Sequence, residues 1–124
     1  MVLDASALLA CIFREPGYDQ VDLESGTVLI SAVNLAEVLT RLVRDGLDVG
    51  RVLADLAETA LEVVPFDTIH ARRAAELLPR TQPHGLSLGD RACLALALQR
   101  ELPALTADRA WTELEVGARV VLIR

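Results

Sequence analysis

The stretch Met1-Val2-Leu3-Asp4-Ala5-Ser6 decides how the rest of the chain is interpreted. Its three apolar residues predict a short strand that ends at Asp4, and the apolar run that follows, up to Phe13, predicts a helix that begins at once. Open α/β sheets bind their ligands beyond the carboxyl ends of their strands. Asp4 is therefore a candidate functional residue as well as a candidate N-cap of the helix.

Length, composition and charge narrow the class of protein. The 124 residues suit one domain, expected over residues 1–124, and 52% hydrophobic but only 3% aromatic residues predict an aliphatic core. There is no membrane-length apolar run and no segment like a signal peptide, so we expect a cytoplasmic protein. The net charge of −6 is the wrong sign for general nucleic-acid binding but suits carboxylates that surround divalent cations. All twelve basic residues are arginine, which excludes sites that need a lysine on phosphate or in a Schiff base.

Apolar segments that alternate between strand and helix patterns organise the whole chain. Strands are expected at residues 1–3, 27–30, 62–64, 104–106 and 119–123. Helices are expected to follow Asp4 and to cover residues 33–45, 49–61, 68–78 and 87–101, with short helical turns at 18–23 and 109–114. Residues 79–85 are expected to form the longest polar break. This alternation predicts an α/β fold with a central, mostly parallel five-stranded sheet that helices cover on both faces.

Four acidic residues stand at predicted strand ends or near helix starts: Asp4, Glu37, Asp90 and Asp108. Each also has a purely structural explanation, because Asp and Glu near a helix start can cap the helix or close a capping box. The glycine directly before Asp90 costs helix stability and suggests that another group approaches closely there. Since a parallel sheet would bring the four carboxylates to one edge, they would repel one another unless cations sit among them. Oxygen ligands of this kind suit Mg²⁺ or Mn²⁺.

The remaining reactive side chains give weaker signals. Ser6 and Thr106 lie two residues from Asp4 and Asp108, so their hydroxyls could hold a carboxylate or a metal-bound water. Cys11 and Cys93 fall in apolar helical patterns and are expected to be reduced, buried thiols. His70, in a predicted outer helix, and His84, in a polar loop, are expected to be solvated and to take no part in chemistry.

The sequence resembles the PIN domain family, and more closely the VapC toxins of type II toxin–antitoxin systems. The matching segments are Val2–Leu9, Ile30–Ser31 with Asn34–Val38, Leu86–Ala97 and Leu105–Asp108. The resemblance extends over essentially the whole chain. It implies a three-layer α/β/α sandwich and a Mg²⁺- or Mn²⁺-dependent endoribonuclease that hydrolyses RNA by a metal-activated water. It also implies a homodimer and a cognate antitoxin that blocks the site.

Carried over by position, the resemblance implies an acidic catalytic and metal-binding site of Asp4, Glu37, Asp90 and Asp108, supported by Ser6 and Thr106. With a negative net charge, the RNA would have to be held by local arginines. The candidates near the acidic residues are Arg14, Arg41, Arg44 and Arg91. Arg41 follows Glu37 by four residues, so an ion pair between the two is an alternative.

Two other functions stay open on the sequence alone. One is a catalytically silent PIN-like module that binds RNA or protein without cleaving it. The other is a different acidic α/β enzyme, such as a phosphatase or a phospho-acceptor domain, against which the absence of lysine argues. The abundance of apolar residues on the predicted helices also favours other chains as partners. We expect a homodimer, and an antitoxin that binds an apolar groove and reaches the acidic site with a basic side chain.

Overall fold

Five parallel strands form the centre of the molecule, described here from a computed structural model of residues 1–124. The strands are β1 (Val2–Leu3), β2 (Val28–Ser31), β3 (Leu61–Val64), β4 (Ala104–Thr106) and β5 (Val120–Leu122). Their order in the sheet is β3-β2-β1-β4-β5, and every neighbouring pair is parallel. The expected five-stranded sheet is confirmed, and it is parallel throughout.

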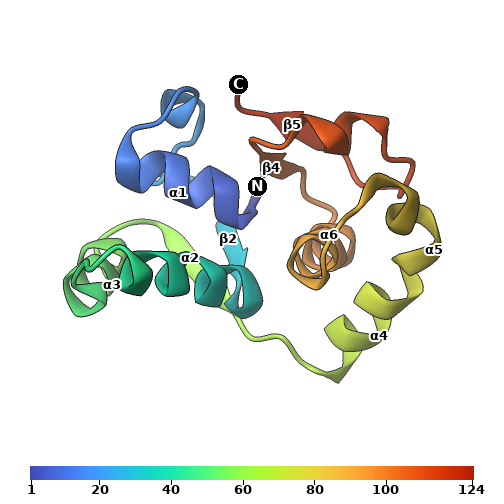
Figure 1. The fold of residues 1–124 in the computed structure, drawn as a ribbon, viewed down its shortest axis with the longest axis horizontal. Helices are drawn as coiled ribbons and strands as arrows, with labels where there is room; N and C mark the ends of the chain where they lie inside the picture. The colour runs from blue at the N-terminus through green and yellow to red at the C-terminus, as the bar shows by residue number, and fades with distance from the viewer.

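Helices cover both faces of this sheet (Figure 1). The α-helices are α1 (Ala5–Phe13), α2 (Ala32–Arg44), α3 (Val49–Ala57), α4 (Thr68–Glu76), α5 (Leu78–Thr81) and α6 (Leu88–Arg100). Short 3-10 turns lie at Tyr18–Gln20, Gln82–His84 and Arg109–Glu113. Figure 1 places α1, α2 and α3 on one side of the sheet and α4, α5 and α6 on the other, which confirms the three-layer α/β/α sandwich.

Two hydrophobic cores, one on each face, hold the layers together. Successive strand residues point to opposite faces, so Val2 and Leu29 belong to the core beneath α4 and α6, whereas Leu3 and Ile30 belong to the core beneath α1 and α2. Trp111 is fully buried in the first of these cores, more deeply than its isolated position in the sequence suggests.

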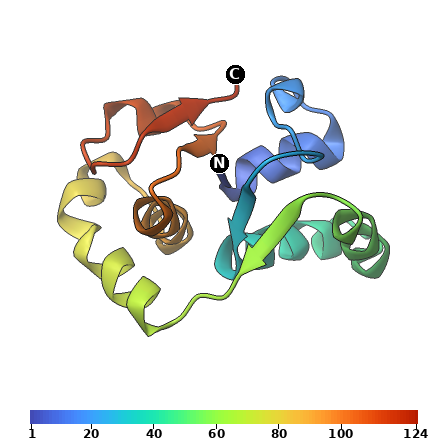
Figure 2. The same cartoon turned by 180° about the vertical axis from the view of Figure 1, so that it is seen from behind.

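The chain changes direction at β1, and this change locates the functional edge of the sheet. From β1 the chain first adds β2 and β3 on one side, and after α6 it adds β4 and β5 on the other. Figure 2 shows the path of the chain from behind: β3 lies beside β2, and from β3 the chain passes to α4 on the opposite face of the sheet. Ligands of such sheets bind at the carboxyl ends of the strands on either side of this switch point, which here are the ends of β1 and β4.

Residues 79–84 are helical rather than an open polar break, and Gly85 ends this segment. The segment consists of the rest of α5 and the 3-10 turn at Gln82–His84, and each of these two elements has a proline in its first two positions. Proline is tolerated there because the first N–H groups of a helix have no partner within the helix.

His70 is also different from the expectation, because it is only 2% exposed and its Nε2 bonds the side-chain oxygen of Gln99. No helix is long and apolar enough to cross a membrane.

Candidate functional site

Asp4 lies at the carboxyl end of β1 and caps α1, as its position in the sequence predicts. Its Oδ1 accepts hydrogen bonds from the Ala7 N–H at 2.8 Å and the Ser6 hydroxyl at 2.7 Å, and Oδ2 accepts one from the Thr106 hydroxyl. The side chain is only 4% exposed. Burial raises the pKa of Asp4 to about 6, although the three hydrogen bonds oppose this rise.

The two hydroxyl residues join the ends of β1 and β4. The Ser6 hydroxyl accepts a hydrogen bond from the Ala107 N–H at 2.8 Å, while Thr106 Oγ1 accepts one from the Asp108 N–H at 3.0 Å. Both hydroxyls donate to Asp4. They therefore hold the Asp4 carboxylate in a fixed orientation and tie it to the backbone of the neighbouring strand end.

Glu37 projects from the second turn of α2, whose N-cap is Ser31. The Asn34 side-chain N–H₂ donates to Glu37 Oε1 at 3.0 Å and to the carbonyl of Gly89 at 2.9 Å, so it links α2 to the start of α6. Partial burial raises the pKa of Glu37, and the nearby charge of Asp90 adds to the rise. The Asn34–Glu37 contact is thus not a capping box, because Asn34 lies inside the helix.

Asp90 occupies the first turn of α6, where the expected capping box is present. Ser87 Oγ accepts from the Asp90 N–H at 3.2 Å, and Asp90 Oδ2 accepts from the Ser87 N–H at 2.9 Å. This structural role leaves Oδ1 without a protein partner. The charge of Asp90 also contributes to the raised pKa values of Asp4 and Glu37, so Asp90 lies close enough to each of them to interact.

Cys93, one turn after Asp90 on α6, shows where the carboxylates converge. This thiol is fully buried, and burial raises its pKa well above the ordinary value. The charges of Asp4, Asp90 and Glu37 raise it further. The three carboxylates therefore lie in the same region of the molecule as this buried, inert thiol.

Asp108 lies at the rim of this cluster rather than within it. It follows β4, is exposed, and uses Oδ1 to cap the turn at Arg109–Glu113 through the Ala110 N–H at 2.9 Å. Its backbone is fixed to Thr106 and through it to Asp4. The sequence grouped four acidic residues, whereas the structure brings three together and places the fourth beside them.

The donor set is composed of carboxylate oxygens, which are the preferred ligands of Mg²⁺ and Mn²⁺. No ion pair offsets the charge of Asp4, Glu37 or Asp90, since the ion pairs of the chain involve only Asp45 and Glu76 as acids. A buried carboxylate without a cationic partner is costly. The chemistry of the site therefore fits a hard divalent cation, although the side chains in this conformation do not form a group of three or more that could hold one.

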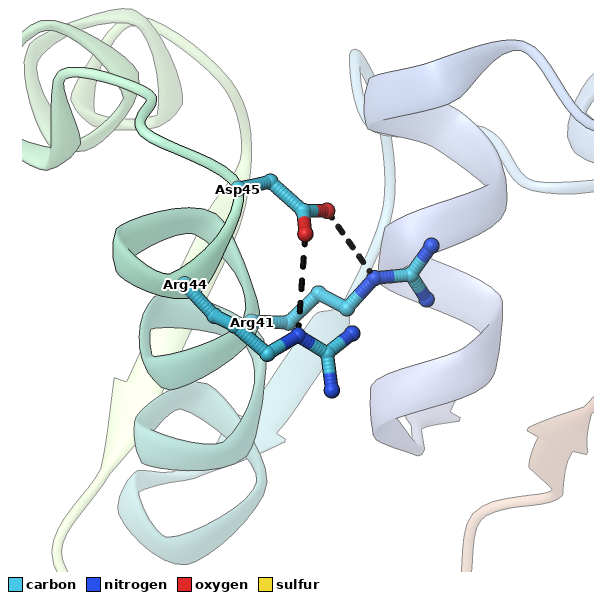
Figure 3. A network of polar contacts seen from close by, with 3 residues as sticks. All are labelled: Arg41, Arg44 and Asp45. Carbon is cyan, nitrogen blue, oxygen red and sulfur yellow. Dashed lines mark hydrogen bonds and ion pairs between the residues drawn. The ribbon is translucent and has the colours of Figure 1, made fainter.

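The four candidate arginines differ in their surroundings. Arg41 and Arg44 both reach the carboxylate of Asp45, at 3.2 and 3.6 Å (Figure 3), and the Arg41 guanidinium also lies 5.4 Å from the ring centre of Phe13. The alternative pairing of Arg41 with Glu37 is therefore wrong.

Arg91 is half-buried, and its guanidinium donates a hydrogen bond to the Ala74 carbonyl at 3.0 Å, near the end of α4. Arg14 is exposed at the end of α1. Of the four arginines, Arg41 and Arg44 share a helix with Glu37, and together with it they line a shallow hollow along α2.

The two contacts that Asn34 makes with Glu37 and Gly89 are not apparent from the sequence. Asn34 lies in one of the segments that match the family, but its bond to Gly89 spans 55 positions. The one signal available was Gly89 itself, a glycine in a helical pattern.

Comparisons with known proteins agree on one family. The PIN domain model matches residues 1–116. Among solved structures, the chain resembles the DNA-bound VapBC of Salmonella typhimurium, with 19% identity, a TM-score of 0.76 and coverage of 99% of this chain and 97% of that one. It also resembles VapC20 of Mycobacterium tuberculosis, a toxin that cleaves the sarcin–ricin loop, with 19% identity, a TM-score of 0.71 and coverage of 92% and 95%.

A third solved structure, VapBC-5 from Mycobacterium tuberculosis, is 25% identical, with a TM-score of 0.58 and coverage of 99% and 96%. No protein with curated annotation matches the sequence significantly. The likeness to these structures concerns the fold, and the family model covers all four acidic positions. The chain belongs to the PIN domain family.

Proposed function

We propose that this chain, as a single domain over residues 1–124, is a Mg²⁺- or Mn²⁺-dependent endoribonuclease and the toxin of a type II toxin–antitoxin pair. The observations that carry the proposal are the link from Glu37 through Asn34 to Gly89, next to Asp90, and the position of Asp4 at the end of β1, which contacts α6. None of the three acids has an ion-pair partner. Membership of the PIN domain family and the likeness to an RNA-cleaving toxin support the same reaction.

Each residue has a distinct role in this proposal. Asp4, Glu37 and Asp90 hold the cation, and Asp108 assists from the rim. Ser6 and Thr106 orient Asp4 through the hydrogen bonds that they donate to its two oxygens. When bound, a divalent cation supplies the positive charge that activates water and stabilises the transition state at phosphorus. No nucleophilic side chain is needed, and Cys93 is too deeply buried to serve as one.

The charge and shape of the surface indicate where the proposed RNA substrate and the proposed antitoxin bind. Arg41 and Arg44 are the arginines best placed to contact RNA phosphates next to Glu37. The proposed antitoxin contributes a basic side chain to the acidic edge and apolar side chains to a hollow of about 630 Å³ between the end of α1 and α3, where Ile12, Val52 and Leu56 contribute to the lining. Similar folds occur in toxin–antitoxin complexes. We also propose that the chain forms a homodimer when the antitoxin is absent.

The test is cleavage of a structured RNA by the purified protein in Mg²⁺, in Mn²⁺ and in EDTA. We expect cleavage only with the metals, and a loss of at least 100-fold in Asp4→Asn and Asp90→Asn. Asp22→Asn, which changes an exposed acid in a turn, serves as the matched control and is expected to cleave like the wild type.

Equal cleavage by the wild type and both site variants would refute the proposed reaction, because the activity would then come from elsewhere. RNA binding without cleavage in any divalent metal would support the catalytically silent module instead. Sedimentation at micromolar concentration tests the homodimer, and a monomer would contradict it.

A further inference from the structure

The Glu37 carboxylate occupies the space that a side chain on residue 89 would need. A Cβ built on Gly89 would lie 2.6 Å from both Cδ and Oε2 of Glu37, closer than real Cβ contacts come. Gly89 is the second residue of α6 and directly precedes Asp90. The absence of a side chain at this one position therefore lets Glu37 approach the helix that carries Asp90.

Nothing in the backbone explains a glycine at this position. Gly89 is not among the residues with positive φ, so the conformational freedom of glycine is not used. A glycine within a helix is less favourable than an alanine. The residue is also buried within the helix interface. The presence of glycine here, despite its lower helix stability, is explained by the Glu37 carboxylate, which occupies the space of a Cβ.

Asn34 holds Glu37 from the other side. This side chain is only 1% exposed, and its amide N–H₂ group divides its two hydrogen bonds between Glu37 Oε1 and the Gly89 carbonyl. Its own Oδ1 is buried and has no hydrogen-bond partner. An unpaired buried acceptor destabilises the fold. Asn34 therefore contributes to the structure through the two hydrogen bonds that its N–H₂ group donates.

We propose that Gly89 and Asn34 are positioning residues that together form a seat for Glu37 and fix its carboxylate beside Asp90. Without the seat, Glu37 is free to turn toward solvent, because its side chain is otherwise exposed. This inference rests on the proposed ribonuclease function and adds two residues to it. Neither residue contacts the substrate in this account; both act through Glu37.

Gly89→Ala is the decisive variant, because it should separate activity from stability. The end of the Glu37 side chain can move, so the protein is expected to fold, with an unfolding midpoint in EDTA equal to or above that of the wild type. RNA cleavage is expected to fall at least tenfold in kcat, with KM changed less than twofold. Gly50→Ala is the matched control: Gly50 is also the second residue of its helix, after the cap Asp48, and its substitution should leave cleavage unchanged.

A double-mutant cycle shows whether the effect passes through Glu37. In a Glu37→Ala background, Gly89→Ala is expected to change kcat less than twofold and to raise the unfolding midpoint in EDTA, because the new methyl group then meets no carboxylate. Asn34→Ala provides a second arm, with a tenfold loss of kcat in the wild type and none in the Glu37→Ala background. Thr81→Val removes a buried hydroxyl elsewhere and should lower only the midpoint.

The outcomes separate the two proposals. If the wild type cleaves no RNA in Mg²⁺ or Mn²⁺, the proposed function fails. If the wild type cleaves RNA and Gly89→Ala cleaves equally well, the seat is refuted. The seat is refuted as well if Gly89→Ala or Asn34→Ala lowers kcat by the same factor with and without Glu37, or if each variant loses activity only in proportion to its unfolded fraction.

Discussion

Replacing Asp4 by asparagine should stabilise the metal-free protein while abolishing its activity. The substitution keeps the size and shape of the side chain and removes a buried charge that no cation offsets. Burial raises the pKa of Asp4 from its ordinary 3.8 to about 6. Because one pKa unit is worth 1.36 kcal/mol, the charged form is disfavoured in the folded protein by about 3 kcal/mol relative to the unfolded chain.

Part of the stability gained in Asp4→Asn is lost because the hydrogen bonds of this side chain change. The asparagine Oδ1 can still accept from Ala7 and Ser6, whereas its N–H₂ group now faces Thr106 Oγ1, which donated before. A lost hydrogen bond to a charged group costs about 1.5–3 kcal/mol, and the new donor recovers part of it. We expect a net stabilisation of about 1 kcal/mol at pH 8 in EDTA, or about 3–6 °C in the unfolding midpoint.

The pH dependence of the free energy of unfolding shows whether the Asp4 charge destabilises the folded protein. Well below pH 3.8, Asp4 is protonated in both the folded and the unfolded chain, so its charge contributes nothing. Between pH 4 and 6 the unfolded chain has lost the proton while the folded protein keeps it, and the destabilisation grows until it is complete above pH 6. The difference in unfolding free energy between Asp4→Asn and the wild type should therefore rise through this window and stay level above it.

Urea unfolding from pH 4 to pH 8 in EDTA, followed by the fluorescence of Trp111, measures this difference directly. Carboxyl groups that do not interact with Asp4 titrate in the same range, but they are common to both proteins and cancel. Adding Mg²⁺ should stabilise the wild type alone, because a ligand that binds only the folded state shifts the equilibrium. A variant that is less stable than the wild type by the same amount at every pH would refute the reasoning.

Three further substitutions test separate parts of the structure. Thr106→Val leaves Oδ2 of Asp4 without its donor and the Asp108 N–H without an acceptor, so it should cost about 1–3 kcal/mol in urea unfolding and lower RNA cleavage, whereas Thr106→Ser should retain both hydrogen bonds. Arg41→Ala should weaken RNA binding and reduce its salt dependence in filter-binding assays at two salt concentrations, with Arg100→Ala, at the far end of α6, unchanged. Leu96→Ala removes a fully buried side chain and should lower the free energy of unfolding by about 2–5 kcal/mol, with metal-dependent cleavage retained at temperatures where the variant is folded.

The features that depend on neighbouring residues could be predicted from the sequence. The strand that ends at Asp4, the caps at Asp4, Ser87 and Asp108, and the alternation of strands and helices all follow from local patterns. The resulting parallel sheet is enough to bring Asp4 and Asp108 to one edge. The exposed position of Asp108, however, depends on its own capping bond to the following turn, which the pattern alone does not place relative to the other carboxylates.

The features that depend on distant contacts could not be predicted. Glu37 lies near Asp90 because α2 packs against α6, where Asn34 donates to a carbonyl 55 residues away. His70 is buried because Gln99, on another helix, supplies a partner for it. Arg41 has acidic residues four positions away on both sides, and it pairs with Asp45, whereas the Glu37 carboxylate lies against Gly89. Periodicity carries no information about such pairings.

Calorimetric titration of the RNA-free protein with Mn²⁺ tests the central claim most directly, namely that Asp4, Glu37 and Asp90 form one cation site. We predict that the wild type binds Mn²⁺, that Asp4→Asn and Asp90→Asn each lose at least tenfold in affinity, and that Asp22→Asn binds like the wild type. Equal Mn²⁺ affinity in the wild type and Asp4→Asn would contradict the account.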